Sequence, residues 1–186
     1  MNAPSRAALA AITREIIERH DDWDSVHQFV TWHWDGERLA PGTVVIIDPA
    51  MDPLDYPRIM AKIVREQRDK GPEHPPYAFL LQIEAFGMTE PGPDATEQER
   101  AAFRAARRGR TFHEMPEAIE SCLAYCADVH GRLWTAGKRR DKDGITEAFY
   151  PPGKGLSGQM VAGLLAVAYA TGMVDYGLPG PGSMAN

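Results

Sequence analysis

The chain has 186 residues, is 44% hydrophobic and carries a formal net charge of -6. That length and apolar fraction suit a single domain with a sizeable core. The acidic balance disfavours a general attraction to nucleic acid or to anionic membrane surfaces.

Cysteine usage and the N-terminal sequence bear on the compartment. The two cysteines, Cys122 and Cys126, form one close pair, and a secreted domain of this size is rarely built around such a pair. Charged residues interrupt the apolar residues of positions 1–20, so this segment does not have the pattern of a signal peptide. The sequence contains no run of about 18 apolar residues. We therefore expect a cytoplasmic protein that does not enter membranes.

The first part of the chain predicts a helix followed by a hairpin. Apolar residues recur at helical spacing over residues 4–20. Apolar and polar residues then alternate over 26–34, which is typical of a strand. Residues 35–42 contain turn-forming residues, and the apolar run 43–48 predicts a second strand that pairs with the first.

The next segment predicts a second helix and a third strand. Asp55 is placed to cap the helix, and Pro57 lies in its first turn. Strand 77–86 follows, and its alternation places Gln82 and Glu84 on one face. The other face of this strand is apolar, with Tyr77, Phe79, Leu81 and Ile83.

Residues 87–117 have the composition of an insertion. They begin with an irregular Pro-Gly segment, and Thr96 and Glu99 have the capping-box spacing that begins a short helix.

Residues 117–129 fit both a helical stripe and a strand. We favour a strand because His130 and Gly131 then form a tight turn between two apolar runs, although Gly131 also suits a helix C-cap.

The end of the chain predicts one helix and a tail. The helix begins with Ser157 as its cap and ends near Thr171, and residues 176–186 are expected to be a mobile C-terminal tail. On this helix small residues recur every four positions, which permits close approach of the sheet or of a second copy of the chain. These residues are Ala162, Ala166 and Ala170.

The predicted element order is α-β-β-α-β-(insertion)-β-β-α. It predicts an α+β fold over residues 1–175, with a single antiparallel sheet of about five strands and helices packed on it. This order resembles that of roadblock and longin domains. The resemblance is one of topology and implies no activity.

One glycine motif suggests a cofactor. Gly153, Gly155 and Gly158 have the G-x-G-x-x-G spacing of dinucleotide-binding proteins, which requires a buried strand before the glycines and a βαβ unit around them. Two prolines precede these glycines and only one helix follows them. We therefore interpret the stretch as the entry loop of a helix and expect no NAD, FAD or other cofactor.

The sequence predicts no metal site. Cys122, Cys126 and His130 are spaced by four residues. In a strand the two cysteines would stand ~13 Å apart, and in a helix Cys122 and His130 would stand ~12 Å apart. A zinc ion needs its ligands at ~2 Å. We therefore interpret both cysteines as structural thiols.

A basic stripe is the candidate contact surface. Arg100, Arg104, Arg107 and Arg108 follow one face of the helix predicted within the insertion. They are candidates for binding an acidic protein partner, although a merely solvated helix face has the same composition. A nucleic-acid contact is the further alternative, disfavoured by the net charge.

Three segments resemble uncharacterised proteins of high-GC actinobacteria and their phages. These are HQFVTWHWDG, IDPAMDPLDYPRIM and YCADVHGRLWTA, and the resemblance extends over most of residues 20–175. It implies a phage or prophage accessory role. It implies no activity and assigns no site residues.

The patterns together favour a non-enzymatic, soluble protein-interaction module that forms a homodimer. The first alternative is a small enzyme whose site is assembled from Asp48, His113 and His130, because catalytic groups converge in space rather than in sequence. The second is a regulator that contacts nucleic acid through the Arg100–Arg108 helix.

Overall fold

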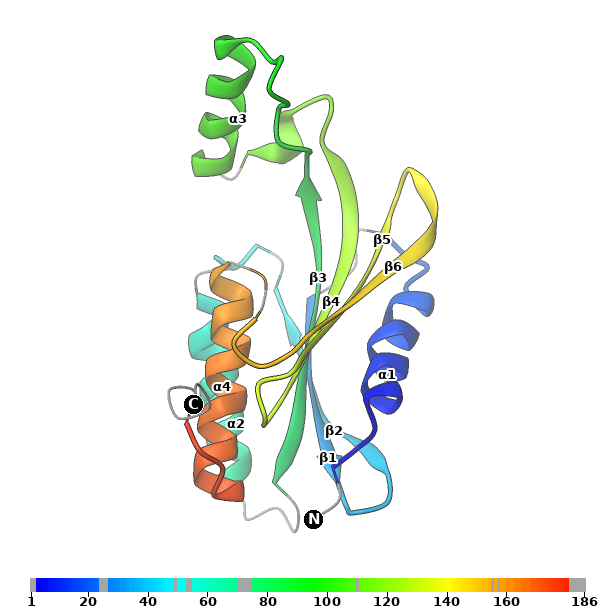
Figure 1. The fold of residues 1–186 in the computed structure, drawn as a ribbon, viewed down its shortest axis with the longest axis vertical. Helices are drawn as coiled ribbons and strands as arrows, with labels where there is room; N and C mark the ends of the chain where they lie inside the picture. Colours follow the sequence, from blue (N-terminus) through cyan, green and yellow to red (C-terminus); the bar gives the residue numbers. More distant parts are fainter. Residues whose placement is uncertain are drawn as a thin grey trace.

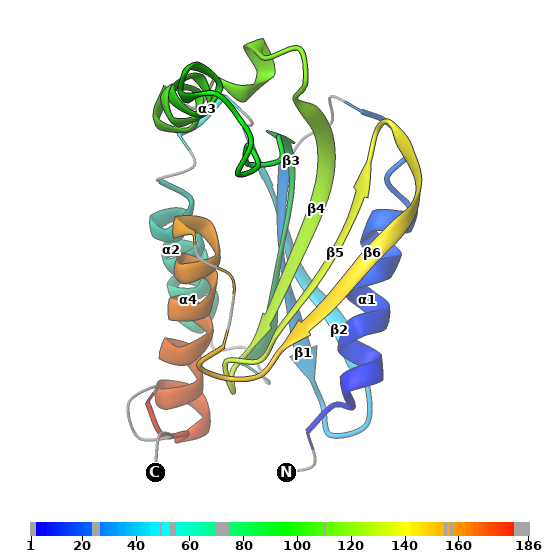
Figure 2. The same ribbon diagram turned by 45° about the horizontal axis from the view of Figure 1, so that its top comes forward.

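The structure is a computed structural model that describes residues 3–23, 27–48, 50–52, 55–69, 75–109, 111–154, 156 and 158–180. One antiparallel sheet of six strands lies between two layers of helices (Figures 1 and 2). The strands in spatial order are β2 (Leu39–Ile47), β1 (His27–Trp34), β3 (Pro76–Gly87), β4 (Ile119–Asp128), β5 (Leu133–Arg139) and β6 (Lys142–Tyr150). The α+β class is confirmed, with six strands in place of about five.

The additional strand is β6, which the sequence pattern did not predict. It lies at one edge of the sheet and pairs only with β5. Lys142, Asp143 and Glu147 are exposed along it, so its apolar alternation is weak. Backbone hydrogen bonds to β5, rather than burial of its side chains, define this strand.

Residues 119–128 form β4, which confirms the strand favoured for the ambiguous segment. Asp128 at its end is buried, and its carboxylate accepts hydrogen bonds from the backbone N–H groups of His130 at 3.1 Å and Arg132 at 3.0 Å. Gly131 lies in the turn with a φ of 73°, and a Cβ there would meet the Tyr169 ring. The glycine therefore belongs to a hairpin turn rather than to a helix C-cap.

The helices cover the two faces of the sheet unequally. Helix α1 (Arg6–Glu18) packs on one face, over β4, β5 and β6. Helices α2 (Tyr56–Asp69) and α4 (Gln159–Tyr176) lie side by side on the opposite face (Figures 1 and 2). Within the described residues, no helix covers β1 and β2 on the α1 face.

Strand β3 is the centre of the core. Its side chains are buried on both faces from Pro76 to Ile83. On the α2 and α4 face, Phe79 stacks against Phe29 of β1 with ring centroids 6.3 Å apart, and Tyr56 and Met60 of α2 are fully buried. The polar Gln82 lies on the α1 face, as its alternation with Phe79 predicted.

Helix α4 is longer than the sequence indicated. It continues past Thr171 to Tyr176, the first residue of the predicted tail, and Asp175 in its last turn forms an ion pair with Arg68 of α2 at 2.6 Å. The predicted cap, Ser157, lies outside the described residues, as do residues 181–186 of the predicted tail.

The alanine stripe of α4 does not face the sheet. Ala162, Ala166 and Ala170 are exposed, and the neighbouring face with Val161, Leu164 and Ala168 is buried. The close approach occurs instead at Gly163, where a Cβ would stand 2.4 Å from the Pro57 ring of α2. A glycine is therefore required where the two helices touch.

Replacing Gly163 by Val should destabilise the protein by about 1–3 kcal/mol, because the added side chain forces α2 and α4 apart. Urea unfolding measures this as a lower transition midpoint. The matched control is Ala162→Val on the exposed side of the same helix, which should change stability by no more than about 0.5 kcal/mol. Equal midpoints for the two variants would show that the α2–α4 contact is not tight.

Candidate functional site

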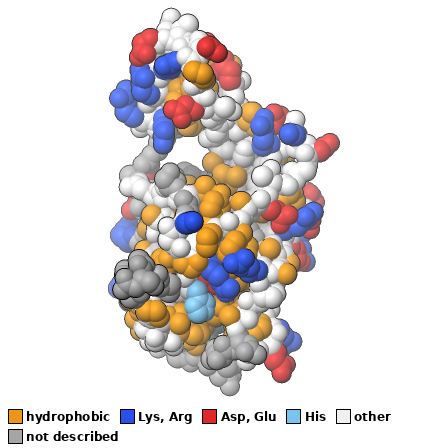
Figure 3. Space-filling view, in the orientation of Figure 1, with side chains coloured by type: hydrophobic (Ala, Val, Ile, Leu, Met, Phe, Trp, Pro, Cys, Tyr) orange, Lys and Arg blue, Asp and Glu red, His pale blue; other side chains and the backbone are white. Residues whose placement is uncertain are grey.

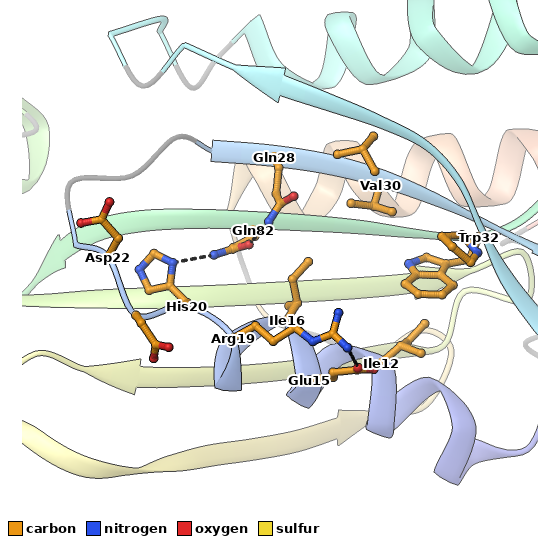
Figure 4. Close-up of a pocket in the computed structure, with 13 residues that line it drawn as sticks. Ile12, Glu15, Ile16, Arg19, His20, Asp22, Gln28, Val30, Trp32 and Gln82 are labelled. Carbon is orange, nitrogen blue, oxygen red and sulfur yellow. Dashed lines mark hydrogen bonds and ion pairs between the residues drawn. The ribbon is translucent and has the colours of Figure 1, made fainter.

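A groove runs between α1 and the uncovered strands β1 and β2 (Figure 4). Its volume is about 520 Å³, which is within the range of small-molecule sites. Glu15 and Arg19 of α1 form an ion pair at its rim. Most of its wall is apolar, with Ile12, Ile16, Val30, Trp32, Pro41 and Val44.

The end of the groove at His20 is polar (Figure 4). His20 follows α1 and is buried, with its Nε2 2.7 Å from Glu84 Oε1. The Gln82 amide Nε2 lies 3.0 Å from His20 Nδ1, and Gln28 Nε2 donates to Gln82 Oε1. With Nδ1 accepting the Gln82 bond, a neutral His20 ring carries its hydrogen on Nε2, the atom that lies in close contact with the Glu84 carboxylate.

Glu84 joins this polar end to the opposite face of the sheet. Its backbone carbonyl accepts a hydrogen bond from His27 Nε2 at 3.1 Å, and the Tyr56 hydroxyl lies 2.5 Å from His27 Nδ1. Burial lowers the pKa of His27, so its imidazole is neutral at pH 7. His27 therefore joins β1, β3 and α2 through both ring nitrogens, and His20 joins the end of α1 to β3 through Nδ1.

The thiol beside this network is not a ready nucleophile. Cys122 Sγ accepts a hydrogen bond from Gln82 Nε2 at 3.3 Å, and burial raises the pKa of Cys122 to about 11. Burial likewise raises the pKa of Cys126 to about 12. Because the thiolate is the reactive form, neither cysteine supports nucleophilic catalysis at neutral pH.

The structure does not bring Asp48, His113 and His130 together. His113 packs against Phe86 at one end of β3, with ring centroids 6.2 Å apart. His130 packs against Tyr77 at the other end, at 5.9 Å. These two positions of β3 are separated by about 30 Å at ~3.3 Å per residue. The enzyme alternative therefore loses its assembled site, because antiparallel pairing of β3 with β4 holds the two histidines at opposite ends.

The glycine motif follows a strand, but not the buried strand that a dinucleotide site requires. Strand β6 ends at Tyr150, but it is an exposed, antiparallel edge strand rather than the buried parallel strand of a dinucleotide fold. Gly153 and Gly158 have φ values of 74° and 143°, and Gly155 lies outside the described residues. Among the described residues, no three His, Cys, Asp or Glu side chains are grouped to hold a metal ion.

Helix α3 (Glu97–Gly109) forms the second candidate surface, in the segment between β3 and β4. It projects beyond the end of the sheet (Figure 1). The predicted capping box is present, since Thr96 Oγ1 accepts from the Glu99 N–H at 3.2 Å and Glu99 Oε2 accepts from the Thr96 N–H at 2.7 Å. Phe103 is buried on its inner side, 5.5 Å from the Phe112 ring.

The four arginines of α3 differ in their surroundings. Arg100 is half-buried, and its guanidinium donates to the backbone carbonyls of Gly92 and Pro93. Arg104, Arg107 and Arg108 are exposed, and Arg104 forms an ion pair with Glu97. We define these three as the α3 basic surface; Lys and Arg side chains gather on the outer side of this part of the molecule (Figure 3).

No family model, curated protein or solved structure matches the chain. In the part of the chain that the structure describes, no helix has the length and apolarity needed to cross a membrane.

The thiols of Cys122 and Cys126 should resist alkylation in the folded protein. Their raised pKa values leave about one thiolate per thousand thiols or fewer at neutral pH. Mass spectrometry after treatment with iodoacetamide should show no adduct on the native chain and two adducts on the chain unfolded in guanidinium. Rapid labelling of the native chain would contradict the assignment of both cysteines as structural.

Millimolar NAD should not raise the melting temperature. A dinucleotide at one hundred times its dissociation constant would add about 2.7 kcal/mol to the stability, which thermal scanning detects easily. A clear rise in the melting temperature would show that the loop before α4 binds the cofactor despite its antiparallel surroundings.

Proposed function

We propose that the protein is a non-enzymatic interaction module whose α3 basic surface contacts an acidic protein partner. One observation carries this proposal: three exposed arginines lie on a helix that projects from the sheet. Folding of this helix depends on other groups, namely Phe103, the capping box and Arg100. Apart from the exposed ion pair of Arg104 with Glu97, the exposed arginines are thus available for a contact.

The charge distribution supports an acidic partner. The chain has a net charge of -6, so a local cluster of positive side chains is a departure from its average. Such a cluster orients and accelerates association with a surface of opposite charge, over distances of about 8–10 Å at physiological ionic strength.

The groove beside α1 supports binding over catalysis. The polar side chains at its polar end bond to one another, and the adjacent thiol is protonated. No described group there is both activated and available to attack a substrate. The resemblance of three segments to uncharacterised proteins of actinobacteria and their phages is the basis for proposing a phage or prophage setting for such a module.

A nucleic-acid contact is the less favoured use of α3. DNA-binding surfaces commonly neutralise about 6–10 phosphates, and the α3 basic surface offers three arginines. Glu97 and Glu99 lie in the first turn of the same helix and would repel a phosphate backbone. Protein surfaces are more tolerant of such a mixed helix.

Charge reversal at Arg107 and Arg108 should weaken binding to a fluorescein-labelled polyglutamate peptide by about tenfold or more, because two attractive charges become repulsive. Fluorescence anisotropy measures the affinity, and raising the salt concentration should have the same effect. The melting temperature should hardly change, since exposed charges contribute about 0–1 kcal/mol to stability.

The matched control is Arg58→Glu with Lys62→Glu on α2. It makes the same charge change on an exposed helix face, and it should leave peptide binding nearly intact. If the control weakens binding equally, the effect is one of net charge and the α3 proposal fails. Tighter binding of a short DNA duplex than of the peptide would favour the nucleic-acid alternative.

A further inference from the structure

We propose that two copies of the chain associate through the edge strand β2, which pairs antiparallel with itself about Val45 and joins the two sheets. This interface is separate from the α3 basic surface. It is inferred from the exposed backbone and side-chain groups of β2, which match those of a second β2.

The two edges of the sheet differ in how they are protected. Edge strands normally carry charges, prolines or bulges that prevent pairing with other chains. Strand β6 has exposed Lys142, Asp143 and Glu147. Strand β2 has no charged residue from Leu39 to Ile47. Pro41 and a shift of register opposite Thr31 of β1 interrupt its first half, and the pairing with β1 is regular from Val44 to Ile47. Residues 43–47 thus form an uncharged, β-branched edge.

One hydrogen bond indicates which backbone groups of β2 point outward. The Thr43 N–H donates to Thr31 Oγ1 of β1 at 3.0 Å, so Thr43 faces β1. Successive residues of a strand direct their backbone groups to opposite sides. Val45 therefore also faces β1, while the N–H and C=O groups of Val44 and Ile46 face away from the sheet.

The register of the sheet gives the same result. The Glu84 carbonyl of β3 points toward β1, where it bonds His27 Nε2, so Gln82 two residues earlier also faces β1. Gln28 pairs with Gln82 and faces β3. Phe29, the next residue, consequently faces β2, where it pairs with Val45.

The residues with outward backbone groups also have exposed apolar side chains. Val44 is 53% exposed and Ile46 is 57% exposed. Both lie on the α1 face, and Val44 forms part of the groove wall. The same two residues thus present backbone groups that no described strand pairs with, together with exposed hydrophobic surface, and an added strand satisfies both.

A second β2 matches this edge in one particular register. When the strand pairing is centred on Val45, Val44 of each copy lies opposite Ile46 of the other copy. Both exposed apolar residues of each copy are then paired. A register that centres on Val44 or on Ile46 pairs one of these residues only with itself and loses the second match. A second copy also offers a strand that is already extended, so association does not require the ordering of a flexible peptide.

A cysteine at Val45 tests the register directly. Across the twofold axis, Val45 meets Val45 of the second copy as a non-hydrogen-bonded pair with Cα atoms about 4.5 Å apart, which is within the ~4.4–6.8 Å span of a disulfide. Under mild oxidation, Val45→Cys should become a covalent dimer on a non-reducing gel. Thr146→Cys, at an exposed position of β6, is the control and should stay monomeric on the gel.

Sedimentation tests the association without a crosslink. The wild-type chain should be a dimer, and Ile46→Pro should be a monomer, because proline removes an outward N–H without removing a bond to β1. Ile46→Lys should also give a monomer, because it places a charge on the pairing edge of each copy. This variant provides the test if the proline variant does not fold. Thr146→Lys should remain a dimer.

Three results would overturn the proposal. The first is a wild-type chain that sediments as a monomer, even if its β2 edge accepts a strand from another protein. The second is a dimer that persists in both Ile46 variants. The third is a dimer that the Ile46 variants dissociate while Val45→Cys fails to form a crosslink. None of these results depends on the polyglutamate experiment, so this interface and the α3 contact are tested independently.

Discussion

The width of the sheet is the constraint from which the exposed surfaces follow. Six strands spaced about 4.8 Å apart span about 24 Å from edge to edge, whereas one helix with its side chains is about 10–12 Å across. Helix α1 therefore covers only β4 to β6 on its face, and α2 with α4 cover the other face more fully. The groove beside α1 and the bare strand β2 both result from this shortage of helix.

The same constraint explains why polar residues occupy the middle of the sheet. Gln82 and Glu84 lie on β3 close to where α1 ends, and His20, which follows that helix end, contacts both side chains. A buried amide or carboxylate is costly unless its hydrogen bonds are made. Here the Gln82 amide bonds to His20 and Gln28, and the Glu84 carboxylate lies 2.7 Å from His20 Nε2, so the network fixes the position of α1 against the sheet and leaves little reactive capacity.

The sequence predicted those parts of the fold that depend only on residues close together in the sequence. The alternation in β1 and β3, the capping box of α3 and the tight turn at Gly131 are local signals, and the structure has them. Strand β6 and the last turn of α4 were missed because their determinants are distant: β5 supplies the hydrogen bonds of β6, and Arg68 partners Asp175. His20 belongs to no motif. The signal that could have indicated it is the pair Gln82 and Glu84 on an otherwise apolar strand.

The two proposed contacts have a joint geometric consequence. Helix α3 lies beyond one end of β3, and an antiparallel β2 pair reverses the strand direction between the two copies. The two α3 basic surfaces would then project from opposite ends of the joined sheet. In such a dimer, one compact partner cannot contact both α3 basic surfaces at the same time. It would bridge two acidic partners, or two sites on a repetitive assembly, and gain avidity where the sites are spaced to match.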